Sequence, residues 1–244
     1  MKIFNRQFFL RTNLRLIKDA FGHLIEVLIN PQKSFGFINR SAVCKIIDYY
    51  AGNSGHQIEK ETANLGYGFI HYSLIRNLKP KRVLCIGSAK GFIPVICGLA
   101  CKDNKTGIVD FVDAGYEKNH PKSWSGDGFW KKADLKKHFS LSGVTGWIET
   151  YVMTTEEVGK MYPKRKYGYI YIDGDHSYEG ARKDYELFWP RLEKGGFMVF
   201  HDVTVKEWGE LKGFGVWKLW QEIKSNHKII FPLKQSGLGI LQKE

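Results

Sequence analysis

The chain has 244 residues, 43% of them hydrophobic, and a formal net charge of +12 at pH 7. A chain of this length can bury a full core without disulfides or a structural metal. No apolar run is long enough to span a bilayer, and the N-terminus lacks the hydrophobic stretch and cleavage site of a secretory signal. We therefore expect a cytoplasmic protein with reduced cysteines. The basic charge favours anionic partners, but without an RNA-binding motif we expect no specific nucleic-acid binding.

Residues 1–60 are expected to form a helical extension. Apolar residues recur with helical spacing from Gln7 to Asn30, and a second helical stretch covers Ala42 to Ala51. The basic residues of the first helix lie off its apolar stripe. Two interpretations therefore stay open, because such a helix can pack on the main domain or a second subunit of a homo-oligomer, or can lie on a membrane surface.

From residue 61 onward, short β-rich runs alternate with helical stretches, which is typical of a parallel sheet with crossover helices. The last two runs are joined by Leu233–Ser236 alone, too short for a crossover helix, so they must form an antiparallel hairpin. We therefore predict an α/β fold over residues 61–244, a doubly wound Rossmann-like seven-stranded sheet with a C-terminal antiparallel hairpin strand. A nicotinamide dehydrogenase would normally continue parallel. The seven predicted strands are Arg82–Ile86, Ile108–Val112, Trp147–Val152, Tyr167–Ile172, Gly196–Phe200, Lys228–Pro232 and Gly237–Gln242.

Three of these strands end in residues suited to a nucleoside ligand. The first runs into a turn with glycines at Gly87 and Gly91, and glycines let a ligand approach the backbone closely. The second ends at Asp113, whose carboxylate can accept both ribose hydroxyls, although it can equally cap a loop. Thr155 and Glu156 follow the third and could reach an adenine edge, or could simply begin a helix.

With these strand ends, residues 62–242 resemble the class I S-adenosylmethionine-dependent methyltransferases, particularly the branch of catechol and macrolide-sugar O-methyltransferases, and also proteins named cephalosporin hydroxylases. Cys85 stands where that family usually carries an acidic residue, so Asp173 is the candidate to hold the methionine ammonium. The resemblance implies S-adenosylmethionine as cofactor, with contacts at Gly87, Ser88 and Gly91, at Asp113 on the ribose, at Thr155 and Glu156 beside adenine, and at Tyr67 and Gly68 near the methionine end.

The most specific string in the chain follows the fourth strand, which delivers Asp173, Asp175 and His176 to the carboxyl edge of the sheet. The next strand ends in His201 and Asp202. Because neighbouring parallel strands end at the same edge, we expect these ionisable groups to lie together, where open α/β folds place their ligands. In the alternative reading, Asp175 caps the following helix and the later pair is a buried hydrogen-bonded unit.

Metal-dependent O-methyltransferases carry an aspartate after the fourth strand and an acidic pair after the fifth. The resemblance thus implies a divalent metal on Asp173, His201 and Asp202, magnesium or, because of the histidine, manganese. In the macrolide-sugar enzymes a histidine three residues after the aspartate acts as base, and His176 has that spacing from Asp173.

We therefore predict an O-methyltransferase acting on a hydroxyl of a sugar, an anionic glycan or another small-molecule acceptor. Specificity would rest on residues 119–139, where Trp124, Phe129 and Trp130 could stack on a sugar face or belong to a core. Two other classes of function stay open, a nicotinamide-dependent oxidoreductase and a non-catalytic protein that binds a membrane or a partner on the same fold.

Overall fold

The computed structural model describes residues 39–51, 55–120, 124, 128–207, 213–231 and 236–244. The chain divides into two compact units, Met1–Lys45 and Ile46–Glu244. The predicted helix over Gln7–Asn30 lies outside the described residues, so its role at a membrane or in an oligomer stays a prediction. The second predicted helix is present as α2 (Arg40–Ile46), followed by a π-helical turn over Ile47–Ala51. None of the described helices is long and apolar enough to cross a membrane.

The second unit begins at Ile46, and the expected division at residue 60 into a helical extension and an α/β domain stays a prediction. Tyr50 donates a hydrogen bond from its hydroxyl to the carbonyl of His138, 2.8 Å away. The backbone N–H of Tyr67 donates to the carbonyl of His56 at 2.9 Å. These contacts join residues far apart in the chain or across a loop. Helical spacing shows that a helix forms, but it does not show the surface on which the helix packs.

The second unit contains a seven-stranded sheet in the order β3-β2-β1-β4-β5-β7-β6. The first five strands are parallel, and β7 is antiparallel to both β5 and β6. The predicted fold class, with its reversed C-terminal hairpin strand, is confirmed. The strands are β1 (Arg82–Ile86), β2 (Ile108–Val112), β3 (Ile148–Tyr151), β4 (Tyr167–Ile172), β5 (Leu192–His201), β6 (Lys228–Phe231) and β7 (Leu238–Gln242).

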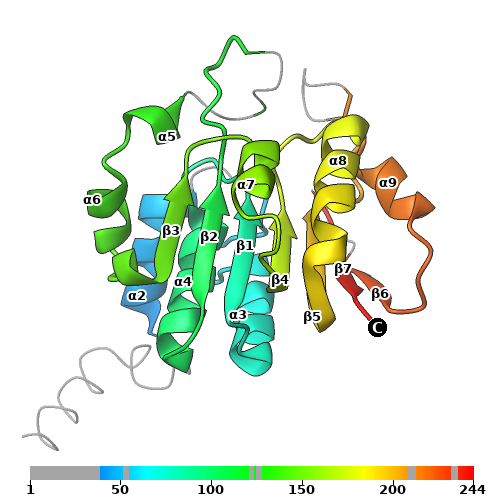
Figure 1. Ribbon diagram of the computed structural model, residues 1–244. Helices are drawn as coiled ribbons and strands as arrows, with labels where there is room; N and C mark the ends of the chain where they lie inside the picture. Colours follow the sequence, from blue (N-terminus) through cyan, green and yellow to red (C-terminus); the bar gives the residue numbers. More distant parts are fainter. Residues whose placement is uncertain (1–38, 52–54, 121–123, 125–127, 208–212, 232–235) are drawn as a thin grey trace, which may run out of the picture. The chain divides into compact units, whose positions relative to one another are not determined.

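Helices cover both faces of this sheet, as the burial of the central strands requires. Figure 1 shows α3 and α4 on one face and α7, α8 and α9 on the other. Every residue of β4 is buried, and the side chains of α4 are buried along almost its whole length. The helices of this unit are α3 (Tyr67–Leu78), α4 (Phe92–Asn104), α5 (Phe129–Lys132), α6 (Leu135–Ser140), α7 (Thr155–Met161), α8 (Tyr178–Phe188) and α9 (Val216–Glu222).

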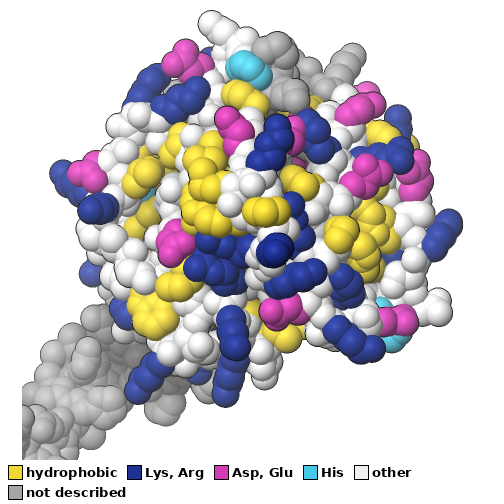
Figure 2. Space-filling model, in the orientation of Figure 1, with side chains coloured by type: hydrophobic (Ala, Val, Ile, Leu, Met, Phe, Trp, Pro, Cys, Tyr) yellow, Lys and Arg dark blue, Asp and Glu magenta, His cyan; other side chains and the backbone are white. Residues whose placement is uncertain are grey.

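The Lys and Arg residues that the structure describes are exposed or partly exposed. On the face shown in Figure 2, Lys and Arg side chains gather in its middle and lower part, below the edge at which β1 to β5 end. Lys160, Lys164, Lys166 and Lys194 are among the exposed basic side chains of the chain. The positive charge is therefore available to the solvent and does not need compensation inside the core.

Candidate functional site

The pairing register brings the ends of the parallel strands to one edge of the sheet. Ile86 at the end of β1 pairs with Val112 of β2 and with Ile172 of β4. Ile172 in turn pairs with Phe200 of β5. The residues that follow these pairs therefore meet at the upper edge in Figure 1, where they line a cavity of about 490 Å³. Ligands of open α/β sheets bind at this edge.

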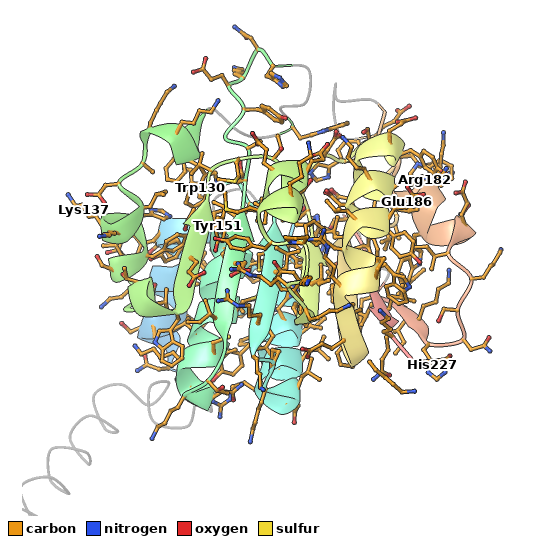
Figure 3. All side chains as sticks on the ribbon, in the orientation of Figure 1. Trp130, Lys137, Tyr151, Arg182, Glu186 and His227 are labelled. Carbon is orange, nitrogen blue, oxygen red and sulfur yellow. The ribbon has the colours of Figure 1, made fainter. Side chains whose placement is uncertain are left out.

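The first wall of the cavity is the turn between β1 and α4. Gly87 has a φ of +74°, and a Cβ placed on it would lie 2.2 Å from the carbonyl oxygen of Asp173, so only glycine fits there. Ser88 accepts a hydrogen bond from the N–H of Gly91 at 3.0 Å, and its own carbonyl accepts from the indole of Trp130 at 2.7 Å. Figure 3 shows Trp130 between α5 and the upper ends of the strands. The turn is held in place by contacts from two elements.

Asp113, at the end of β2, lies directly against this turn. Its carboxylate accepts hydrogen bonds from the N–H of Ser88 at 3.2 Å and from the N–H of Gly115 at 2.8 Å. Burial raises the pKa of Asp113, and these two hydrogen bonds oppose that shift. The structure therefore brings the predicted glycine turn and the predicted ribose carboxylate together, with carboxylate lone pairs left for a ligand.

Thr155 and Glu156 are the first residues of α7, and both line the cavity. The helix is capped by the preceding Thr154, whose hydroxyl accepts from the N–H of Glu157 while the Glu157 carboxylate accepts from the N–H of Thr154. Glu156 forms an ion pair with Lys183 of α8. Thr154 and Glu157 therefore cap the helix, and the predicted contact residues Thr155 and Glu156 lie between them without forming the cap.

Three of the predicted contact residues, Tyr67, Gly68 and Gly91, do not line the cavity. Tyr67 is completely buried at the start of α3, and a Cβ on Gly68 would lie 3.0 Å from the ring of Phe92. Cys85 also points away, because its sulfur lies 3.7 Å from that of Cys97 in the core. The predicted role of Tyr67 and Gly68 at the methionine end thus gains no support from their positions.

The ends of β4 and β5 form the chemical part of the cavity. Nδ1 of His176 lies 2.5 Å from Oδ2 of Asp202, and its Nε2 lies 3.9 Å from Oδ1 of Asp173. Nδ1 of His201 lies 3.1 Å from Oδ1 of Asp173 and 3.2 Å from Oδ1 of Asp202. All four groups line the same cavity, so the predicted cluster of Asp173, His176, His201 and Asp202 is confirmed as a structural unit.

The charges within this cluster balance. Burial by itself lowers the pKa of both imidazoles, but the nearby carboxylates outweigh it and hold the pKa of His176 above its ordinary value and that of His201 far above it. Burial raises the pKa of the carboxyls, yet His201 and His176 together more than offset this and hold the pKa of Asp173 and Asp202 below the ordinary value. The cluster is therefore most stable as paired opposite charges.

The same cluster contains three groups that could ligate a metal. One ligand atom each from Asp173, His201 and Asp202 lies within 4.8 Å of the others. Within the described part of the chain, neither ring nitrogen of His201 has a well-aligned hydrogen-bond partner. Oδ1 of Asp202 has none either, whereas Oδ2 of Asp202 contacts His176. Buried polar atoms of this kind are normally satisfied, so they fit a site that receives a further ligand.

Sequence reasoning missed two buried groups on the cavity wall. His56 precedes α3, and its ring centroid lies 4.5 Å from that of His201. Burial lowers the pKa of His56 to about 3, so this imidazole is neutral. Asp184 of α8 is only 4% exposed, and burial raises its pKa to about 7. Neither residue follows a strand, so the rule that located the other groups could not find them.

Aromatic side chains surround the exposed side of His176. The ring centroids of Trp124 and Phe214 lie 5.3 Å and 5.4 Å from that of His176 and 4.9 Å from each other. The indole of Trp124 donates a hydrogen bond to Asp175 at 3.0 Å. Trp130, by contrast, is 3% exposed and supports the glycine turn. The predicted aromatic group therefore divides. Trp124 lies beside the imidazole, Trp130 belongs to the core, and the half-buried Phe129 lines the cavity.

Comparison with known proteins agrees with this geometry. Residues 84–203 match the model of a family described as a methyltransferase domain. The chain is also 26% identical over 197 residues to an uncharacterized protein (y4gI) of Sinorhizobium fredii; the match covers 76% of this chain and 20% of the relative. The chain thus spans about a fifth of the length of that curated relative.

Solved structures share the fold at low sequence identity. An O-methyltransferase from Bacillus cereus in complex with SAH has a TM-score of 0.57 and 10% identity, with 86% of this chain and 94% of that chain covered. The O-methyltransferase TomG from Streptomyces achromogenes, involved in tomaymycin synthesis and solved with SAM, has a TM-score of 0.56 and 13% identity, covering 84% and 89%. The resemblance inferred from the strand ends is thereby confirmed. Residues 84–203 are thus similar to a methyltransferase domain, and the seven-stranded fold that contains them is shared with these two O-methyltransferase structures.

Proposed function

We propose that this chain is an S-adenosylmethionine-dependent O-methyltransferase that acts on a hydroxyl of a small-molecule acceptor such as a sugar. One observation carries the proposal, since a single cavity joins the nucleoside cradle of Gly87 and Asp113 to the paired His176 and Asp202. Structures of the same fold were solved with SAM or SAH, which supports this choice of cofactor. The reversed strand β7 argues against a nicotinamide-dependent oxidoreductase.

The cradle fits a nucleoside without phosphates. Gly87 leaves space that a side chain would fill, and Asp113 keeps lone pairs for hydroxyl groups. The cofactor would supply a sulfonium methyl group that is already activated for transfer. The protein must therefore mainly align the acceptor oxygen and exclude water.

His176 is placed to remove the proton of the acceptor hydroxyl. Its Nδ1 contacts Asp202, which fixes the orientation of the ring, so the neutral imidazole keeps its proton on Nδ1 and can accept a proton at Nε2. A hydroxyl is a poor nucleophile at neutral pH, so a base at this position contributes directly to the rate. His201 remains the alternative base. Trp124 and Phe214 offer flat apolar faces beside His176, which supports an acceptor with a ring that can stack.

Calorimetric titration tests the proposed cofactor. We expect the wild-type protein to bind S-adenosylmethionine and S-adenosylhomocysteine but not NADH. Asp113→Ala should weaken the binding of both cofactor forms by about 1–3 kcal/mol, because it leaves the ribose hydroxyls without their acceptor. Glu244→Ala, a change in the exposed C-terminal residue, serves as the control. Absence of binding to the wild type at millimolar cofactor would contradict the proposal.

We also propose a divalent cation on Asp173, His201 and Asp202, whose donor set fits manganese better than magnesium because it contains a nitrogen. Titration of chelator-treated protein should give an affinity for Mn²⁺ about tenfold or more above that for Mg²⁺. Asp202→Asn should weaken both, while His201→Asp should reduce the preference for Mn²⁺. The proposed metal site is wrong if the wild type binds neither ion, or if Asp202→Asn binds both ions with wild-type affinity.

A further inference from the structure

Asp184 is a buried carboxyl group that the proposed reaction does not use. It lies on α8 with Ala181 and Phe188 as the buried residues of that helix. Figure 3 shows Arg182 and Glu186 together on the side of α8 that faces away from α7, where they form an ion pair. Within the described part of the chain Asp184 has no cationic partner at ion-pair distance, since the adjacent Lys183 pairs with Glu156. A buried carboxylate without a cation is costly, so this group needs another explanation.

The surroundings of Asp184 favour its neutral form. Burial is the main cause of its raised pKa, and the negative charges of Glu156 and Asp175 raise it further. The hydroxyl of Thr155 and the charge of Lys183 oppose the shift, yet the pKa stays at about 7. Below that pH the group offers one O–H donor and one carbonyl acceptor side by side.

The position of Asp184 in the cavity indicates what it faces. A Cβ on Gly174, which follows Asp173 at the end of β4, would lie 3.7 Å from Oδ2 of Asp184. Asp184 therefore lies beside the loop after β4, and it shares the cavity wall with the start of α7. Asp113 marks the place of the ribose, and His176 marks the place of methyl transfer. The end of the cavity between α7 and α8 is then left for the base of the nucleoside.

We infer that the neutral carboxyl group of Asp184 recognises the adenine base of the cofactor, donating its O–H to a ring nitrogen and accepting from the exocyclic amine. This inference rests on the proposed function, because it assumes a bound adenosyl group. Adenine presents a ring-nitrogen acceptor beside an amine donor, and a neutral carboxyl group matches both. An ionised carboxylate can only accept, and it would repel the lone pair of the ring nitrogen.

The inference is tested first with altered ligands. Wild-type protein is titrated at about pH 6 with S-adenosylhomocysteine and with its 1-deaza, 3-deaza and 7-deaza analogues, each lacking one ring nitrogen. Either the 1-deaza or the 7-deaza analogue should bind about tenfold or more weakly than the parent compound, because N1 and N7 are the ring nitrogens beside the exocyclic amine and loss of the bound one leaves the O–H of Asp184 unpaired. The 3-deaza analogue should bind like the parent compound. In Asp184→Ala that difference should disappear, whereas Arg182→Ala, a change on the exposed side of the same helix, should keep it in full. Equal affinity of the wild type for all four compounds would overturn the inference.

The pH dependence provides a second, independent measurement. The affinity of the wild type for S-adenosylhomocysteine should fall as pH rises through about 7, because the proton that is donated to the base is lost. Asp184→Asn keeps a donor and an acceptor at every pH, so its affinity at about pH 8.5 should remain close to that at pH 6. The same pH dependence in both proteins contradicts the inference, even if Asp184→Ala fails to fold. Failure of the wild type to bind S-adenosylhomocysteine at all would instead refute the proposed function and this inference with it.

Discussion

His176→Ala is expected to lower turnover on the order of 10²-fold or more while leaving cofactor affinity within a factor of a few. The imidazole is the group in the cavity that combines a fixed orientation, through Asp202, with a nitrogen that can accept the acceptor proton. The cofactor cradle lies at the ends of β1 and β2 and does not depend on this side chain. Single-turnover rates with saturating cofactor, together with calorimetric cofactor affinities, separate the two effects.

His227→Ala is the matched control for this experiment. His227 is exposed near the C-terminus, where it lies 2.9 Å from Glu244, so its removal should change neither rate nor affinity. Near-normal turnover in His176→Ala would transfer the role of base to His201, whose Nδ1 contacts both carboxylates. A comparable loss in His201→Ala but not in His176→Ala would then establish that alternative.

Most strands could be predicted from the sequence because each is a short β-rich run bounded by turn residues. The runs Arg82–Ile86, Ile108–Val112 and Tyr167–Ile172 coincide with β1, β2 and β4. The fifth strand is longer than predicted, since β5 begins at Leu192 and contains Gly195 and Gly196. Glycines normally weaken a strand, and here the pairing of Leu192 with Tyr167 of β4 extends it. The residues of one strand do not show that it pairs with a distant strand, so the longer β5 could not be predicted from its own sequence.

The candidate site was predictable as far as it follows the strand ends. Asp113, Asp173 and His201 each come directly after or at the end of a parallel strand, so topology alone brings them to one edge. His56 reaches the same cavity from a loop before α3, held by a backbone hydrogen bond that no sequence pattern reveals. Asp184 did leave a signal, because it is an ionisable residue at the helical spacing of the buried Ala181 and Phe188.

Gly87→Ala is expected to lower the free energy of unfolding by about 2–4 kcal/mol. Two costs add at this position, since the backbone has a φ of +74° and the new Cβ would overlap the carbonyl group of Asp173 at 2.2 Å. Relief of that overlap must separate the end of β1 from the end of β4. Because Ser88 follows directly and donates to Asp113, the cradle should distort with it, and affinity for S-adenosylhomocysteine should fall on the order of 10²-fold.

Two other glycines allow these costs to be separated. Gly195 has a φ of +78° but open space where a Cβ would lie, so Gly195→Ala should show the backbone cost alone, about 1 kcal/mol. Gly146 has neither a positive φ nor a neighbour within 4 Å of that position, so Gly146→Ala should be close to neutral. Urea denaturation gives the three stabilities, and calorimetry gives the affinities of the variants that remain folded. If Gly87→Ala loses no more stability than Gly195→Ala, the close approach of β1 and β4 does not shape the cradle. If it loses stability but keeps full affinity, the cofactor lies elsewhere in the cavity, because a ligand seated on this turn must respond to its displacement.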